Sequence, residues 1–193
     1  MKKRSKKSSK LWEVADAALE WAETLVLSVF VVIFCFTFLV RIATVNGTSM
    51  ENTLFENDKL LVTHLMYTPR QQDIVVVDSK ALDEIIIKRI IATEGQHLEI
   101  DYDSGTVTVD GKLLDEPYIK EAMIATGNAA DSFYNTQRGI YEYDVPENCV
   151  FVMGDNRNVS ADSRSFGFVN EEDIIGKAFY RFWSERVRGG KLY

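Results

Sequence analysis

Cysteine is scarce in this chain, and the two cysteines that occur lie far apart in the sequence. Cys35 falls inside a long apolar run, whereas Cys149 comes much later in a polar context. No Cys-x-x-Cys spacing is present, so the sequence excludes a disulfide framework and a dithiol redox motif. A domain of this size can be stable on its hydrophobic core alone, so the lack of disulfides does not assign a compartment.

Histidine is equally scarce, since only His64 and His97 occur. Neither has Cys, His or Asp neighbours at the spacing of a metal site. The sequence therefore predicts no metal ion and no other cofactor. A serine hydrolase with a histidine base would need a partner constellation that is also missing.

Net positive charge is lacking beyond the first ten residues, because Asp and Glu outnumber Lys and Arg there. Six of the first ten residues are Lys or Arg, so the rest carries −13 against a total of −7. An acidic body disfavours binding to a phosphate backbone, and we predict no nucleic-acid partner. The basic tail is better read as a membrane-surface or orientation signal.

One long apolar run is present, "TLVLSVFVVIFCFTFLVRI" at residues 24–42. About 20 helical residues cross the hydrocarbon core of a bilayer. A cleaved secretory signal has the same order of features, but its apolar centre is shorter, and here the polar, amphipathic stretch "LWEVADAALEWAE" separates the lysines from the run. We predict an uncleaved signal-anchor at 24–43 and a basic, amphipathic tail at 1–23. Because positive charge precedes the span, the tail is expected in the cytoplasm and residues 44–193 outside it.

The part after the anchor has the pattern of β-strands. Short β-branched runs bounded by turn residues occur at 58–67, 73–79, 84–93, 97–102, 106–114 and 149–155. Helical signal is weak there and is limited to about 170–175. The fold class is therefore mainly β, with an N-terminal transmembrane helix and an exported domain of antiparallel sheets. A small loop-rich insertion is expected within about 100–143, with 116–143 its least strand-like part.

Three segments contain residues of chemical interest. The first is "GTSMENTL" at 47–54, where Ser49 is either a turn residue or a nucleophile. The second is "IIIKRIIATEGQ" at 85–96, where Lys88 shares a strand face with Ile86 and Ile90. A lysine there either shields a strand edge or has a lowered pKa that suits it as a base. The third is "GDNRNVSADSRSFGFV" at 154–169, either a long polar turn or the partner of the other two.

Taken together and in this order behind an anchor, these segments resemble type I signal peptidases, membrane-bound Ser-Lys proteases that remove signal peptides. The resemblance spans residues 18–182 and is most specific in "VPENCVFVMGDNRNVSADSRSFGFV". The single span and compact exported domain are similar to the short form common in Gram-positive bacteria. The resemblance implies a plasma-membrane protein that lies close to the secretion translocon. It also implies cleavage after small residues of the Ala-x-Ala type, with signal peptides and the lipid bilayer as partners.

The resemblance also implies roles for individual residues. Ser49 corresponds to the nucleophile, Lys88 to its general base, and Ser160 to the residue that orients the lysine. Four further residues correspond to positions that support the site: Asp155, Arg89, Asp162 and Arg164. Met50 and Gly47 correspond to positions that contact substrate or help to bind the oxyanion. Gly47 stands where some relatives have a hydroxyl that donates to the oxyanion, and Asn52 and Gln72 replace a common proline and glycine.

Two other functions fit parts of the same pattern. An autoprotease of the SOS-repressor type has the same dyad chemistry, but no DNA-binding helix-turn-helix is visible in the sequence. An anchored β domain without activity would bind exported chains, but the presence of Ser49, Lys88 and Ser160 disfavours it.

Overall fold

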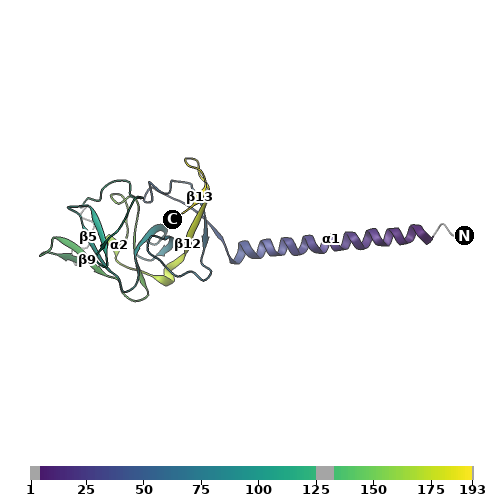
Figure 1. Ribbon diagram of the computed structural model, residues 1–193, viewed down its shortest axis with the longest axis horizontal. Coiled ribbons are helices and arrows are strands. Elements are labelled where there is room, and N and C mark those ends of the chain that lie inside the picture. The colour runs from purple at the N-terminus through teal and green to yellow at the C-terminus, as the bar shows by residue number, and fades with distance from the viewer. Residues whose placement is uncertain (1–4, 125–132, 193) are drawn as a thin grey trace. The chain divides into compact units, whose positions relative to one another are not determined.

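The structure is a computed structural model that describes residues 5–124 and 133–192. It divides into two units, Met1–Arg41 and Ile42–Tyr193. The first contains one helix and the second contains the β-sheets (Figure 1).

Helix α1 runs from Ser5 to Phe38 without a proline or glycine to interrupt it. Within it, Trp12–Phe34 is long and apolar enough to cross a membrane by length and composition. The predicted tail and anchor thus join in one continuous helix, although residues 1–4 of the tail lie outside the described residues. The structure differs at the far end of the predicted span 24–43, because Arg41–Thr44 forms strand β1.

The larger sheet has the order β1-β2-β12-β3-β4-β10-β11. The short strand β13 lies outside this order and pairs antiparallel with β12. The pairs of β12 with β2 and β3, of β3 with β4 and of β4 with β10 are antiparallel. The strands besides β1 are β2 (Lys59–Thr63), β3 (Ile74–Ser79), β4 (Glu84–Ala92), β10 (Cys149–Met153), β11 (Val169–Asn170), β12 (Ile174–Trp183) and β13 (Gly190–Lys191).

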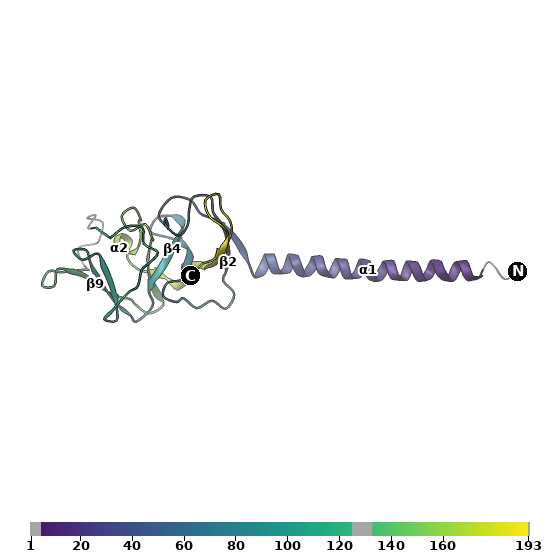
Figure 2. The same cartoon turned by 45° about the horizontal axis from the view of Figure 1, so that its top comes forward.

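The smaller sheet has the order β7-β6-β5-β9-β8 and is antiparallel throughout. In both views it lies at the end of the β domain away from β2, β12 and β13 (Figures 1 and 2). Asp110 and Gly111 connect β6 to β7 with positive φ angles of 49° and 72°, as a two-residue hairpin turn requires. Its strands are β5 (His97–Asp101), β6 (Thr106–Val109), β7 (Lys112–Leu113), β8 (Tyr134–Asn135) and β9 (Ile140–Asp144).

The mainly antiparallel β fold predicted from the sequence is confirmed, but the structure differs from the predicted elements in three places. The helix expected at 170–175 is strand β11 followed by a 3₁₀ turn, η2 (Glu171–Asp173). Strand β12, which lies between β2 and β3, was not predicted. Gly176 and Lys177 interrupt the apolar pattern that would have indicated a strand. Gly176 is required there, since a Cβ would lie 2.6 Å from the carbonyl oxygen of Thr63. Strand β8 and most of β9 also fall inside the segment 116–143 that was expected to be loop-rich.

The buried core of the β domain falls into three clusters. One joins the smaller sheet to β4 and β10 through residues such as Leu98, Tyr143 and Phe151. A second contains Met50 and Leu54 together with residues of β2, β3 and β12, so the chain that follows β1 is fixed to the larger sheet. The third packs β3, β4 and β10.

Candidate active site

Ser49 lies in the loop between β1 and β2, and two apolar residues that follow it are buried. Met50 and Leu54 are 2% and 0% exposed, whereas Ser49 is only partly covered. The backbone N–H groups of Thr53 and Leu54 both donate to the carbonyl oxygen of Met50, at 2.9 and 2.8 Å. The side chains of Met50 and Leu54 therefore attach the loop to the core, whereas Ser49 stays partly accessible. Met50 is a core residue here, which gives no support to its predicted contact with substrate.

Lys88 lies in the middle of β4, and its side chain is on the same face as Ile86 and Ile90. It is 4% exposed, and its Nζ is 2.8 Å from Ser49 Oγ. Burial lowers the pKa of the Lys88 amine from its usual value, while Asp162 and Glu84 oppose the shift. A neutral amine at this distance can accept the proton of the hydroxyl.

Arg89 points to the opposite face of β4 and pairs with Asp155, just beyond the end of β10. Its Nε and Nη2 donate to Oδ1 and Oδ2 at 2.8 and 2.7 Å. Thr53 Oγ1 also donates to Asp155, so this carboxylate joins the Ser49 loop to β4. Arg89 Nη1 donates to the carbonyl oxygen of Gln72 at 2.8 Å. The predicted support of the site by Arg89 and Asp155 has a clear geometric basis.

Asp162 and Arg164 form a second buried pair at the start of the short helix α2 (Ser163–Phe166). Arg164 Nε donates to Asp162 Oδ1 at 2.8 Å, and Asp162 also caps the helix by accepting from the Arg164 backbone N–H. The N–H of Gly154 donates to Asp162 Oδ2 at 2.9 Å. This pair therefore fixes the polar loop that follows β10.

Ser160 is 9% exposed, and its hydroxyl has no hydrogen-bond partner in the part of the chain that the structure describes. The predicted contact with Lys88 is not formed. Ser160 nevertheless lies against the Ser49 loop across Gly154. A Cβ at Gly154 would lie 2.5 Å from the carbonyl oxygen of Ser49 and 2.6 Å from Ser160 Cβ, and would clash with Ser160 Oγ.

Sequence reasoning did not assign roles to Gly154, Asn156 and Thr53. The Asn156 backbone N–H donates to the carbonyl oxygen of Ser49 at 3.0 Å, and its side-chain amide donates to that of Thr48 at 3.1 Å. Asn156 thus holds both residues at the start of the nucleophile loop. The glycine and the two asparagines in "GDNRN" were the only sequence feature that could have indicated this close approach of two loops.

Gly47, predicted near the oxyanion site, is exposed and has a φ of 84°, and a Cβ there would meet nothing within 4 Å. Glycine is needed at this position for its backbone conformation rather than for space.

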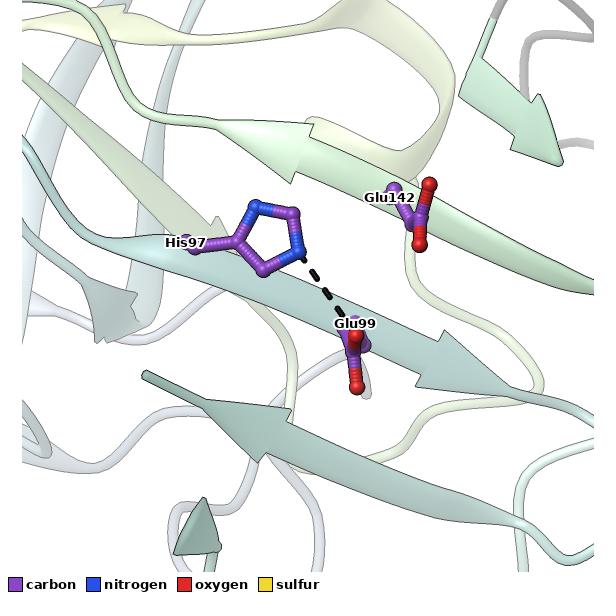
Figure 3. Close-up of side chains that lie close together, drawn as sticks. All are labelled: His97, Glu99 and Glu142. Atoms are coloured by element: carbon purple, nitrogen blue, oxygen red, sulfur yellow. Dashed lines mark ion pairs between the residues drawn. The ribbon is translucent and has the colours of Figure 1, made fainter. Parts of the chain in front are cut away.

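One group of side chains has the composition of a metal site, His97, Glu99 and Glu142, with ligand atoms within 4.8 Å of one another. His97 and Glu99 project from β5 and Glu142 from the neighbouring β9 (Figure 3). Arg138 Nη1, however, lies 2.5 Å from both glutamates and supplies the positive charge. His97 Nδ1 is 2.7 Å from Asp144, and this contact is the main reason that the pKa of His97 is raised. The group is best described as a partly exposed ion-pair cluster.

At the candidate site a buried lysine, rather than a histidine, lies within hydrogen-bond distance of the serine hydroxyl. Comparison with known proteins assigns the chain to a family. The family model described as "Signal peptidase, peptidase S26" matches residues 18–183. The chain therefore belongs to the signal peptidase family, whose signal peptidase I members are serine endopeptidases.

Two relatives agree with this assignment by sequence identity. A probable signal peptidase I-2 of Synechocystis is 34% identical over 86% of this chain and 73% of its own length. Signal peptidase I P of Bacillus subtilis subsp. natto is 32% identical over 90% of this chain and 94% of its own length. A crystal structure of a signal peptidase I from Enterococcus faecalis is 28% identical, covers 57% of this chain and 97% of that one, and has a TM-score of 0.45.

Proposed function

We propose that this protein removes signal peptides from exported preproteins, with Ser49 as nucleophile and neutral Lys88 as general base. The observation that carries the proposal is the 2.8 Å distance between Lys88 Nζ and Ser49 Oγ, at a lysine that is 4% exposed. A serine hydroxyl becomes a good nucleophile when a positioned base removes its proton. The buried setting of Lys88 supplies that base without histidine.

In the proposed reaction, Ser49 Oγ attacks the carbonyl carbon of the scissile peptide bond and its proton passes to Lys88 Nζ. The tetrahedral intermediate places negative charge on the former carbonyl oxygen, and the Ser49 backbone N–H is one donor for it. Collapse of the intermediate breaks the C–N bond, and Lys88 returns the proton to the leaving amine. Water activated by Lys88 then hydrolyses the acyl-enzyme and restores Ser49.

Ser160 is proposed to orient the Lys88 amine during this cycle. Its hydroxyl is buried without a partner among the described residues, which is unfavourable by about 1–3 kcal/mol. A contact with the amine in the substrate complex would remove that cost. Arg89, Asp155, Asp162 and Arg164 hold the surrounding loops through their buried ion pairs.

Helix α1 and the family support a proposal for the substrate and the location. Helix α1 would anchor the enzyme in the plasma membrane with its basic end in the cytoplasm, so that the β domain meets preproteins on the exported side near the translocon. Cleavage would follow small residues in an Ala-x-Ala pattern. Signal peptides would bind in an extended form along a sheet edge.

The test is cleavage of one preprotein with an Ala-x-Ala site by the detergent-solubilised full chain and its variants. Ser49→Ala and Lys88→Ala should each lose nearly all activity, whereas His64→Ala should match the unchanged enzyme. Substantial cleavage by Ser49→Ala would refute the nucleophile assignment, and substantial cleavage by Lys88→Ala would refute the base.

A further inference from the structure

Residues 116–124, which we call the strap, follow strand β7 and form neither helix nor strand. The strap is anchored at its far end by Met123, which is 1% exposed in the core cluster of the smaller sheet. Between its ends it contacts all three of the segments that carry the site. Nothing in the proposed reaction assigns it a role.

The strap first contacts the loop after β10. Glu116 and Arg157 form an ion pair whose side chains are 7% and 1% exposed. Arg157 Nε in turn donates to the carbonyl oxygen of Gly154 at 3.1 Å. Further along, the N–H of Ile124 donates to Asn158 Oδ1 at 3.0 Å, and the Asn158 amide donates back to the Ala122 carbonyl oxygen at 3.1 Å.

Tyr118 connects the Glu116–Arg157 ion pair to the Arg89–Asp155 ion pair. Its ring lies against the guanidinium of Arg89, with 3.9 Å between Arg89 Cζ and the ring centroid. Its hydroxyl donates to Glu116 Oε1 at 3.1 Å. Burial, reinforced by Glu116, raises the pKa of the Tyr118 phenol, so the hydroxyl stays protonated and remains a donor. A desolvated cation over an aromatic face is a favourable contact.

Lys120 completes the set by contacting the nucleophile loop. Its backbone N–H donates to the carbonyl oxygen of Asp155 at 3.4 Å, and its Nζ lies 3.4 Å from Glu51 Oε2. Arg186 lies 3.5 Å from the other oxygen of Glu51. Both cations are largely exposed, so these pairs add little stability. The buried contacts of Tyr118 and Glu116 are therefore the ones that matter.

We propose that the strap positions the catalytic loops, and that Tyr118 and Glu116 are its positioning residues. This inference rests on the proposed function of Ser49 and Lys88. Tyr118 covers Arg89, Arg89 binds Asp155, and Asp155 binds Thr53 in the nucleophile loop. Tyr118 also binds Glu116, Glu116 pairs with Arg157, and Arg157 binds the carbonyl oxygen of Gly154. Gly154 is the residue at which Ser49 and Ser160 approach each other. Proteins hold reacting groups to within about 0.5 Å through supporting contacts of this kind.

The experiment compares Tyr118→Leu, Tyr118→Phe and the control Tyr134→Leu, all as full chains in detergent. Tyr134 is a partly exposed tyrosine of the smaller sheet that packs on Tyr141, away from the site residues. For each variant, kcat and KM are measured across pH with a peptide that contains an Ala-x-Ala site. Hydrogen exchange is measured for peptides covering 47–55 and 154–160.

Tyr118→Leu should lower kcat on the order of 10- to 100-fold with little change in KM, because misplaced catalytic groups slow the chemical step. The acidic limb of the kcat profile should move to higher pH, since looser loops admit water to Lys88. The charged groups that act on Lys88 are Asp162, Glu84, Arg164 and Asp155, and none is altered by the substitution. Tyr118→Phe should recover most but not all of kcat, because it keeps the ring on Arg89 and loses the hydrogen bond to Glu116.

Exchange in both peptides should accelerate in Tyr118→Leu and stay unchanged in Tyr134→Leu. Unchanged exchange in Tyr118→Leu, a loss of kcat with an unmoved acidic limb, or the same effects in Tyr134→Leu would overturn the strap's role. The proposed function fails separately, through an inactive unaltered enzyme or an active Ser49→Ala variant, and the exchange data test the strap in either case.

Discussion

Arg89, inside β4, and Asp155, just beyond the end of β10, are joined by two hydrogen bonds of 2.8 and 2.7 Å, and each side chain is 1% exposed. The pair lies on the opposite side of β4 from Lys88, yet it reaches the nucleophile loop through Thr53. The position of Ser49 therefore depends on a buried ion pair that does not touch it.

Asp155→Ala should destabilise the β domain by about 3–5 kcal/mol, because it leaves the Arg89 guanidinium buried without its carboxylate. Urea unfolding of the full chain measures this directly. Asp103→Ala is the matched control, since Asp103 is exposed in the loop between β5 and β6. Equal midpoints for the two variants would contradict the assigned importance of the pair.

Activity should rise with pH along a limb that reports Lys88. Burial lowers the pKa of this amine, and only the neutral form can accept the Ser49 proton. The limb should therefore lie below the value of about 10.4 that is usual for an exposed lysine. The kcat/KM profile of the unaltered enzyme checks this, and a limb at or above that value would disagree with a desolvated base.

Stability should rise with pH between the lowered pKa of Lys88 and that of an exposed lysine. In this window the unfolded chain binds more protons than the folded one, so raising the pH favours the folded state. Lys88→Met should remove this contribution and increase stability at neutral pH by roughly 1–3 kcal/mol, because a buried amine is replaced by an apolar side chain. Thermal unfolding of both proteins at several pH values gives the comparison. A Lys88→Met variant with the same pH dependence as the unaltered enzyme would be the contrary result.

Gly154→Ala should abolish most activity, because its Cβ would lie 2.5 Å from the Ser49 carbonyl oxygen and clash with Ser160. Two loops would have to separate to admit it. Gly190→Ala is the control, since a Cβ there meets nothing within 4 Å. Preprotein cleavage by both variants tests the difference, and an active Gly154→Ala enzyme would show that the loops need not approach so closely.

Chelation should leave cleavage unchanged. Arg138 already supplies a cation to Glu99 and Glu142, and the proposed chemistry uses only Ser49 and Lys88. Dialysis against EDTA followed by the cleavage assay measures this. A loss of activity that zinc restores would instead assign a metal to the cluster of His97, Glu99 and Glu142.

The sequence by itself determined the fold class, most strand positions and the three segments that converge on the site. Apolar periodicity reports burial directly, so β3, β4 and β10 were predictable, whereas Lys88 among isoleucines was compatible with either an edge-shielding lysine or a desolvated amine. Strand β12 was not predictable, because its glycine and charged residues make sense only beside β2 and β3.

Only the tertiary structure decided how the three segments meet. Sequence separation carries no information on distance, so the approach of Lys88 to Ser49 and of Gly154 to the Ser49 carbonyl came from the packing of β4, β10 and the loop held by Met50 and Leu54. The same is true of the strap: its residues have no distinctive pattern, and their contacts with Arg89, Arg157 and Asp155 arise because the core of the smaller sheet fixes both ends of the chain that carries them.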